Sequence, residues 1–235
     1  MTRPISDACL KCHVTFAKNT DASGKGNTYE NNNFIYGIDC ERCHRPAEKH
    51  VIYHRANPDS VQPKFIMLAD TLSRQQSLDI CAQCHSGLRS QQLKGGPFSF
   101  MAGENLELYS RNYYFNRPGA KLDVHGNQYG LLTSSKCFKE SPKMDCTTCH
   151  NPHKNQRGDT SYFNHKCISC HETLISMCTA PKSEINAMAN NCIACHMPLS
   201  PSETMKVKLT QDEDEAPIMI RSHLIGVYPN SAQMK

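Results

Sequence analysis

CTTCHNPHKNQRGDTSYFNHKCISCH, residues 146–171, contains the pattern Cys-x-x-Cys-His at its beginning and again at its end. Across the 235 residues this pattern occurs six times and takes up twelve of the fourteen cysteines, so it organises the chain. The six copies are Cys9, Cys12 and His13; Cys40, Cys43 and His44; Cys81, Cys84 and His85; Cys146, Cys149 and His150; Cys167, Cys170 and His171; and Cys192, Cys195 and His196.

The spacing of the pattern is that of a covalent c-type haem site. Two thiols about one helical turn apart can bond to the two vinyl groups of one haem, and the following imidazole then points at the iron. Zinc ribbons also use Cys-x-x-Cys pairs, but zinc does not require a histidine after each second cysteine. With 12 histidines in 235 residues, six such neighbours arise by chance with a probability on the order of 10⁻⁸. The sequence therefore predicts six c-type haems with six proximal histidine ligands.

Six haem irons need six distal ligands, and six histidines remain outside the pattern. They are His50, His54, His125, His153, His165 and His223. The equal numbers predict mostly bis-histidine coordination, with these six as metal ligands. His153 and His165 each lie too close to a motif to reach the far side of its haem. We therefore expect these two to bind the iron of a neighbouring haem.

Some alternatives for the distal ligands stay open. His50 and His54 are four residues apart on one helix face, so one of them could be a spare. Any of the six could instead be an ordinary surface histidine or bond a haem propionate. Methionine is another distal ligand, and Met67, Met101 and Met144 are candidates, although most methionines are expected to serve packing.

The composition indicates a thin side-chain core. Hydrophobic residues make up 38% of the chain and tryptophan is absent, so another group is needed to fill the interior. No run approaches the roughly 18 apolar residues of a membrane helix. We predict a mainly α fold with much irregular loop, in which short helices wrap around a stacked multihaem core with little or no β-sheet. It is expected to be a single domain, 1–235, with halves 1–95 and 130–235.

Local signals predict where several elements begin. Asp39 and Asp145 directly precede a motif and Ser73 precedes another helical stretch, so each is a candidate N-cap. Helical spacing of apolar residues predicts a further helix that starts at Ser183 and runs into the last motif. Residues 18–33 are polar and rich in asparagine, and we expect them to form an exposed loop.

Residues 86–145 lack the pattern but hold eight of the seventeen aromatic residues. We expect them to form a lid over porphyrin faces, with the wall of a substrate pocket as the alternative. They are Phe98, Phe100, Tyr109, Tyr113, Tyr114, Phe115, Tyr129 and Phe138.

Outside the pattern, Cys137 and Cys178 are predicted to form a disulfide that closes a loop of about 40 residues, with two free thiols as the alternative.

Charge and compartment follow from the cofactor. A ferric haem with two neutral histidines and ionised propionates carries about −1, so six haems take the formal charge from +4 to roughly −2. The positive formal charge of the polypeptide alone thus gives no support to nucleic-acid binding.

Covalent haem attachment takes place outside the cytoplasm, so we expect a periplasmic or extracellular protein. MTRPISDAC lacks an apolar signal region, and we expect that a signal peptide has been removed or that the chain is a fragment or processed form.

Several stretches resemble the multihaem c-type cytochromes that are related to the tetrahaem cytochrome and the hydroxylamine oxidoreductase of ammonia oxidisers, and Bacteroidota-type members are the most similar. The stretches are GIDCERCHRPAEKHV, DVHGNQYGLLTSSKCF, MDCTTCHNPH and NNCIACHMP. The resemblance extends from Cys9 to about Tyr228 and implies closely stacked, bis-histidine haem pairs. It supports His50, His125, His153 and His223 as distal ligands. Such relatives often have a longer N-terminal region, so a distal ligand from outside this sequence or from another subunit stays an open alternative.

The sequence favours electron transfer between redox proteins, with haems that conduct and no catalytic residue. A second hypothesis is a subunit of an extracellular cytochrome filament, a homo-oligomer with haem contacts between subunits. A third is an oxidoreductase of nitrogen compounds, which needs one iron with an open coordination position. The Cys-x-x-Cys-Lys motif of pentahaem nitrite reductases is absent from the sequence.

Overall fold

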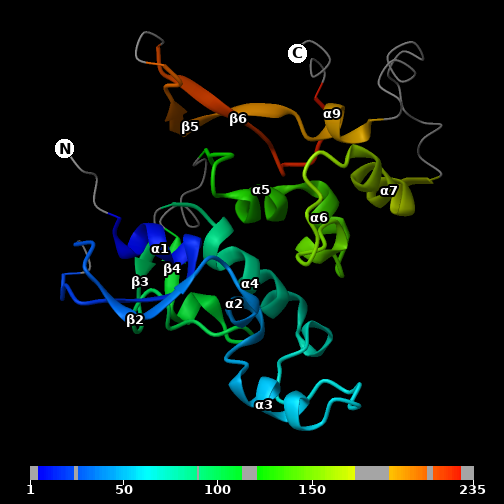
Figure 1. Ribbon diagram of the computed structural model, residues 1–235. Coiled ribbons are helices and arrows are strands. Elements are labelled where there is room, and N and C mark those ends of the chain that lie inside the picture. Colours follow the sequence, from blue (N-terminus) through cyan, green and yellow to red (C-terminus); the bar gives the residue numbers. More distant parts are fainter. Residues whose placement is uncertain are drawn as a thin grey trace. The chain divides into compact units, whose positions relative to one another are not determined.

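The computed structural model describes residues 5–23, 26–88, 90–112, 121–172, 191–210 and 214–228 (Figure 1). The chain forms two compact units, residues 1–118 and residues 119–235. The boundary falls within the segment that lacks the haem motif, so each unit carries three of the six motifs.

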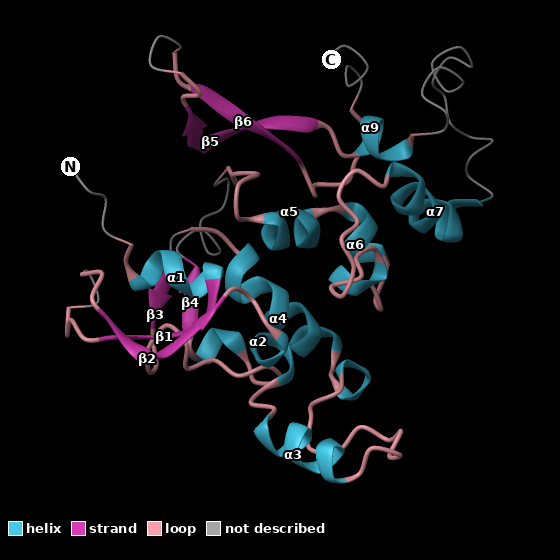
Figure 2. Ribbon diagram, viewed as in Figure 1, coloured by secondary structure: helices cyan, strands magenta, loops and turns pink. Residues whose placement is uncertain are grey.

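Short helices and loops make up most of both units, and the strands form small two-stranded antiparallel sheets (Figure 2). This confirms the predicted mainly α fold with much irregular loop. Unit 1 contains α1 (Asp7–His13), β1 (Val14–Asn19), β2 (Tyr29–Tyr36), α2 (Cys40–His44), α3 (Glu48–Ala56), η1 (Ala69–Thr71), α4 (Arg74–His85), β3 (Ser90–Gln92), η2 (Leu106–Leu108) and β4 (Ser110–Asn112). Unit 2 contains α5 (Gln128–Ser134), α6 (Lys136–Glu140), η3 (Cys146–Thr148), α7 (Thr160–His171), α9 (Cys192–His196), β5 (Leu199–Val207) and β6 (Ala216–Arg221). Strand β1 pairs with β2, β3 with β4, and β5 with β6.

The predicted N-caps are confirmed. The Asp39 carboxylate accepts a hydrogen bond from the Glu41 amide at the start of α2. The Asp145 carboxylate accepts from the Thr147 and Thr148 amides at η3, a 3₁₀ turn. Ser73 begins α4 with a reciprocal capping box to Gln76. The helix expected from Ser183 lies mostly outside the described residues, although α9 carries the last motif.

The hairpin of β1 and β2 differs from the expected loop at 18–33. Residues 18–19 belong to β1 and residues 29–33 belong to β2, so the loop prediction is wrong for them. The hairpin forms because its apolar side chains pack on the core of unit 1, where Leu10, Val14, Ala17 and Phe98 are buried. Packing against this core outweighs the weak strand preference of the asparagine-rich sequence.

Helix α4 is joined to the aromatic-rich segment by a buried carboxylate. Asp79 is only 3% exposed and accepts hydrogen bonds from the Leu106 amide, at 3.0 Å, and from Gln75 Nε2, at 2.7 Å. Burial raises the pKa of Asp79, and the two hydrogen bonds offset this only in part. The link holds η2 against the helix that carries the third motif.

In unit 2, the β5–β6 hairpin lies beside the segment that precedes α5. The Ser202 side chain is 2% exposed, and the core of the unit includes Val124, Leu131 and Leu132. Gln128 in α5 donates from Nε2 to the Arg221 carbonyl of β6 at 3.4 Å. Within the ranges described above, no helix has the length and apolar character needed to cross a membrane.

The buried carboxylate predicts a pH-dependent effect of Asp79→Asn on the free energy of unfolding. Because the pKa of Asp79 is higher in the folded chain than in the unfolded chain, wild type gains stability, relative to the variant, as the pH falls through that raised pKa. The stability of Asp79→Asn minus that of wild type should therefore decrease from pH 7 to pH 4. Urea unfolding at both pH values measures this difference. Asp59→Asn removes the same charge at an exposed position and is the control, and a pH-independent difference for Asp79→Asn would contradict the prediction.

Candidate haem centres

In unit 1, the first and third motifs are in direct contact. The thiol of Cys84 donates to the Lys11 carbonyl at 3.7 Å, and the thiol of Cys12 donates to the Cys84 carbonyl at 3.9 Å. Both motifs occupy the C-terminal ends of helices, α1 and α4. Groups attached at these cysteines are therefore neighbours.

The second motif joins the same group. Arg42 of α2 donates from Nη2 to the Lys11 carbonyl in the first motif at 2.9 Å. Burial, and then the neighbouring Cys81 thiol of the third motif, raise the pKa of Cys43. All three motifs of unit 1 thus lie together, although 26 residues or more separate their sequences.

Unit 2 gathers its three motifs in the same way. Burial, and then the thiols of Cys192 and Cys149, raise the pKa of Cys167 to about 11. Helix α7 carries the fifth motif, and it contacts α9, whose residues are the sixth motif. Cys137 lies in this group, because its thiol contributes to the raised pKa of Cys149. Cys178, its predicted disulfide partner, lies outside the described residues.

Two proximal histidines have an orientation that suits a metal ligand. Nδ1 of His44 is 2.8 Å from the Met67 carbonyl, and Nδ1 of His196 is 2.8 Å from the Gly226 carbonyl. A carbonyl only accepts, so each Nδ1 carries the proton and each Nε2 carries the lone pair that a metal needs. Metal-binding histidines are usually held by such a second hydrogen bond. These residues therefore fit a haem iron bound through Nε2.

The backbone of Lys64 distinguishes the two histidines of α3. The Lys64 carbonyl accepts from Nδ1 of His50 at 2.7 Å, which leaves the lone pair of His50 on Nε2. The Lys64 amide donates to Nε2 of His54 at 3.4 Å, so this nitrogen of His54 already has a partner. Phe65, the next residue, has a φ of 57°, a strained backbone conformation for a bulky side chain. The loop is thus held in a shape that orients His50.

Exposed apolar side chains occur on α3 and on the adjacent loop. Val51 and Ile52 on α3 are 40% and 60% exposed, and Phe65 on the adjacent loop is 62% exposed. Exposed apolar side chains that lie together usually mark a binding surface. Ile52 lies about 200° from His50 around α3, so only those of these side chains that share the face of His50 can contact the same porphyrin.

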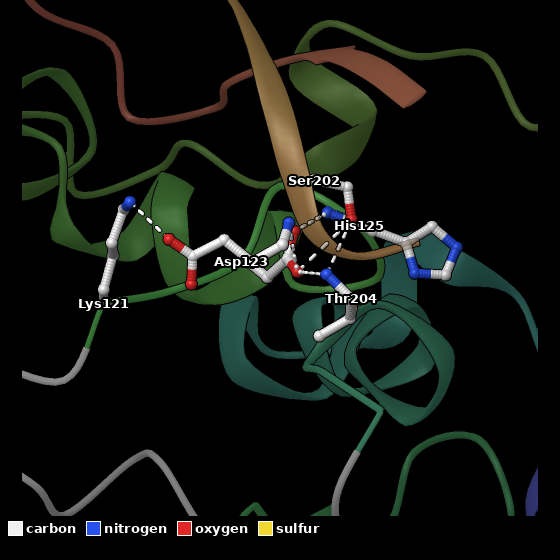
Figure 3. A network of polar contacts seen from close by, with 6 residues as sticks. Lys121, Asp123, His125, Ser202 and Thr204 are labelled. Atoms are coloured by element: carbon white, nitrogen blue, oxygen red, sulfur yellow. Dashed lines mark hydrogen bonds and ion pairs between the residues drawn. The ribbon is translucent and has the colours of Figure 1, made fainter. Parts of the chain in front are cut away.

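His125 is positioned by a polar network that Figure 3 shows. The Asp123 carboxylate accepts from the amides of His125, at 2.9 Å, and Thr204, at 2.8 Å, and also from the Glu203 amide and the Ser202 hydroxyl. Burial raises the pKa of Asp123, but these hydrogen bonds together hold it below its usual value. The His125 imidazole points away from the network, and its buried Nδ1 has no hydrogen-bond partner among the described residues.

The ring of His223 is stacked on that of a proximal histidine. The rings of His150 and His223 are nearly parallel, at 20°, with centroids 5.9 Å apart. Two imidazoles on opposite sides of one metal ion have ring centres roughly 6 Å apart, if each metal–nitrogen bond is about 2 Å and each ring adds about 1 Å. The spacing of this pair therefore suits two ligands of one iron.

The other two candidates are exposed. His153 lies in the turn after η3, where its backbone amide donates to Asn151. His165 lies on α7, two residues before Cys167. Their role as distal ligands stays a prediction. Counted by unit, residues 1–118 contain two distal candidates and residues 119–235 contain four.

Sequence reasoning missed the residues that orient the histidines. The carbonyls of Lys64, Met67 and Gly226 act through the backbone, which leaves no signal in residue type. Asp123 did have a signal, since an aspartate two residues before a histidine often bonds the backbone amide of that residue.

The family model described as "Cytochrome c554 and c-prime" matches residues 2–45, which include the first two motifs. No curated protein and no solved structure matches the chain. The match supports a cytochrome c family, and with it covalently bound c-type haem and haem-based electron transfer in general. Cytochromes of this kind are typically exported from the cytoplasm, which agrees with the expected location.

The Asp123 network predicts a loss of stability in Asp123→Ala. This variant removes the acceptor of three backbone amides, and we expect the free energy of unfolding to fall by about 2 kcal/mol. Hydrogen exchange at the amides of His125, Glu203 and Thr204 should become faster. Glu203→Ala, which removes only the exposed ion pair with Lys121, is the control and should cost less than about 1 kcal/mol. Unchanged exchange in Asp123→Ala would contradict this account of how His125 is held.

Proposed function

We propose that this protein is a six-haem cytochrome c that transfers electrons between redox proteins outside the cytoplasm. The observation that carries the proposal is the convergence of three haem motifs within each unit. Bound haem supplies the reversible one-electron chemistry of its iron. The polypeptide supplies the spacing, because cysteines in direct contact, such as Cys12 and Cys84, attach groups that must be neighbours.

We further propose specific distal ligands. His50 is favoured over His54, because Lys64 gives His50 the tautomer with a lone pair on Nε2 and already occupies Nε2 of His54. His223 is favoured as the partner of His150, because of their ring spacing. His125, His153 and His165 are the candidates for the remaining irons of unit 2.

The uneven distribution of histidines supports a second candidate function. Unit 1 has three proximal histidines but only His50 and His54 as further histidines. At least one iron there, and two if His54 is not a ligand, needs Met67, Met101 or a ligand from elsewhere, or else has an open position. An open position is what an oxidoreductase of nitrogen compounds requires, whereas a ligand from a second copy of the chain would fit a filament subunit.

The first test is the haem content and the spin state of the oxidised protein. We expect six covalent haems per chain, measured against protein concentration, with at least five low-spin irons in a quantified low-temperature EPR spectrum. A high-spin signal near one per chain would favour the second function, and nitrite and hydroxylamine would then be assayed. If the protein is produced in a host that attaches c-type haem and still carries no covalent haem, the proposed function is overturned. If it carries fewer than six, the predicted number of haems is overturned.

The ligand assignment predicts different outcomes for neighbouring histidines. His50→Ala and His223→Ala should each convert one of the six irons from low-spin to high-spin, because a methyl group cannot replace the imidazole. His54→Ala, the matched control on α3, should leave every spin state unchanged. The same EPR measurement reads all three variants, with haem content checked to confirm that maturation is intact. A high-spin iron in His54→Ala together with an unchanged spectrum of His50→Ala would reverse the assignment.

A further inference from the structure

A pocket lies in unit 1 where the three motif helices meet. Its lining includes Lys11, Arg42 and Gln83, together with Phe100, Tyr109 and Ser110. The pocket is small, with a cavity volume of about 20 Å³, and it is partly open to solvent. Lys11, Arg42 and Gln83 hold the same position in their motifs, directly before the second cysteine. The pocket is therefore built by one equivalent residue from each of the three motifs.

Helix geometry separates this pocket from the haems of the same motifs. Successive residues of an α-helix are about 100° apart, so the position before the second cysteine lies roughly 200° from the first cysteine. The two cysteines and the histidine share the opposite face. Lys11, Arg42 and Gln83 thus project from the backs of their helices, away from the haem that each motif attaches.

The pocket contains a buried cation with incomplete hydrogen bonding. Arg42 is 8% exposed, and its guanidinium lies 5.4 Å from the centre of the Phe98 ring. Nη2 donates to the Lys11 carbonyl, but the buried Nε has no hydrogen-bond partner among the described residues. In the part of the chain that the structure describes, no carboxylate lines the pocket and no residue forms an ion pair with Arg42. A buried charge without an opposite charge is costly, so this arrangement favours an anion.

Gln83 indicates that the anion also has a hydrogen-bond donor. Its Nε2 donates to the Ile80 carbonyl at 2.8 Å, whereas none of the described residues donates a hydrogen bond to its buried Oε1. A complementary ligand must accept from Arg42 and also donate to Gln83. An oxyanion that retains a proton, such as hydrogen phosphate, does both, whereas a fully ionised carboxylate only accepts. Lys11, whose Nζ donates to Ser90, adds a second positive charge beside the pocket.

We propose that this pocket binds a small, partly protonated oxyanion of the phosphate class. The equivalent positions in unit 2 are Thr148, Ser169 and Ala194, none of them charged, so the site is specific to unit 1. The site goes beyond the proposed electron transfer and does not depend on it. Because Arg42 also holds the first two motifs together, the anion stabilises the place where these motifs meet.

The test is binding of inorganic phosphate to the haem-loaded protein by calorimetry, at constant ionic strength set with chloride. We expect saturable binding to wild type, a rise of the thermal midpoint with phosphate, and binding weaker by roughly tenfold or more in Arg42→Gln. Arg111→Gln is the matched control. Arg111 is exposed and adjoins Ser110 on β4, so alternation along the strand points its side chain away from the pocket.

Gln83→Met keeps the test valid if Arg42→Gln does not fold. It removes the Oε1 acceptor together with the Nε2 donor to the Ile80 carbonyl, and it should also weaken phosphate binding. Two results would overturn the proposal: no saturable binding to wild type, or equal binding to Gln83→Met and wild type. A shift in the reduction potential of one haem in Arg42→Gln, without any phosphate binding to wild type, would instead identify a haem propionate as the occupant and also overturn it. Haem content and spin state are measured in parallel, so failure of this site is separable from failure of the cytochrome function.

Discussion

An imidazole can bind a metal in a fixed direction only when its other nitrogen is held. In this protein the hydrogen bonds that hold it come from backbone carbonyls, those of Met67 for His44, Gly226 for His196 and Lys64 for His50. These carbonyls belong to segments outside helices and strands, where a carbonyl has no regular backbone partner. The large share of irregular chain is therefore functional, since regular elements would use the same carbonyls for their own hydrogen bonds.

Features that depend on neighbouring residues were predictable from the sequence. The caps at Ser73, Asp39 and Asp145 required only the residue type and its place before a helical stretch. The six motifs and their histidines followed from spacing alone. Features that depend on distant residues were not predictable, such as the hairpin that buries Val14 and Ala17 against Phe98. The choice between His50 and His54 depends on a backbone that returns to α3 from Lys64, and no residue type encodes that return.

The two units apply one plan with different side chains. Each brings three motifs together, but unit 1 places Lys11, Arg42 and Gln83 on the backs of its motif helices, while unit 2 places smaller uncharged residues there. Unit 1 also has fewer histidines beyond its motifs. Cations near a haem stabilise its reduced form, because reduction adds a negative charge. Haems attached to the two units would therefore experience different electrostatic surroundings even where their attachment is identical.

The position of Lys64 also has a consequence for the order of folding. The hydrogen bonds of helix α3 join residues that are close in sequence. The helix presents His50 and His54 one turn apart, with ring centroids 4.6 Å from each other. Before the loop returns, either imidazole can compete for the same partner. Docking of residue 64 ends this competition, because a single peptide group orients one histidine and blocks the other. The backbone at Phe65, with its φ of 57°, is thus part of the loop on which the choice between the two histidines depends.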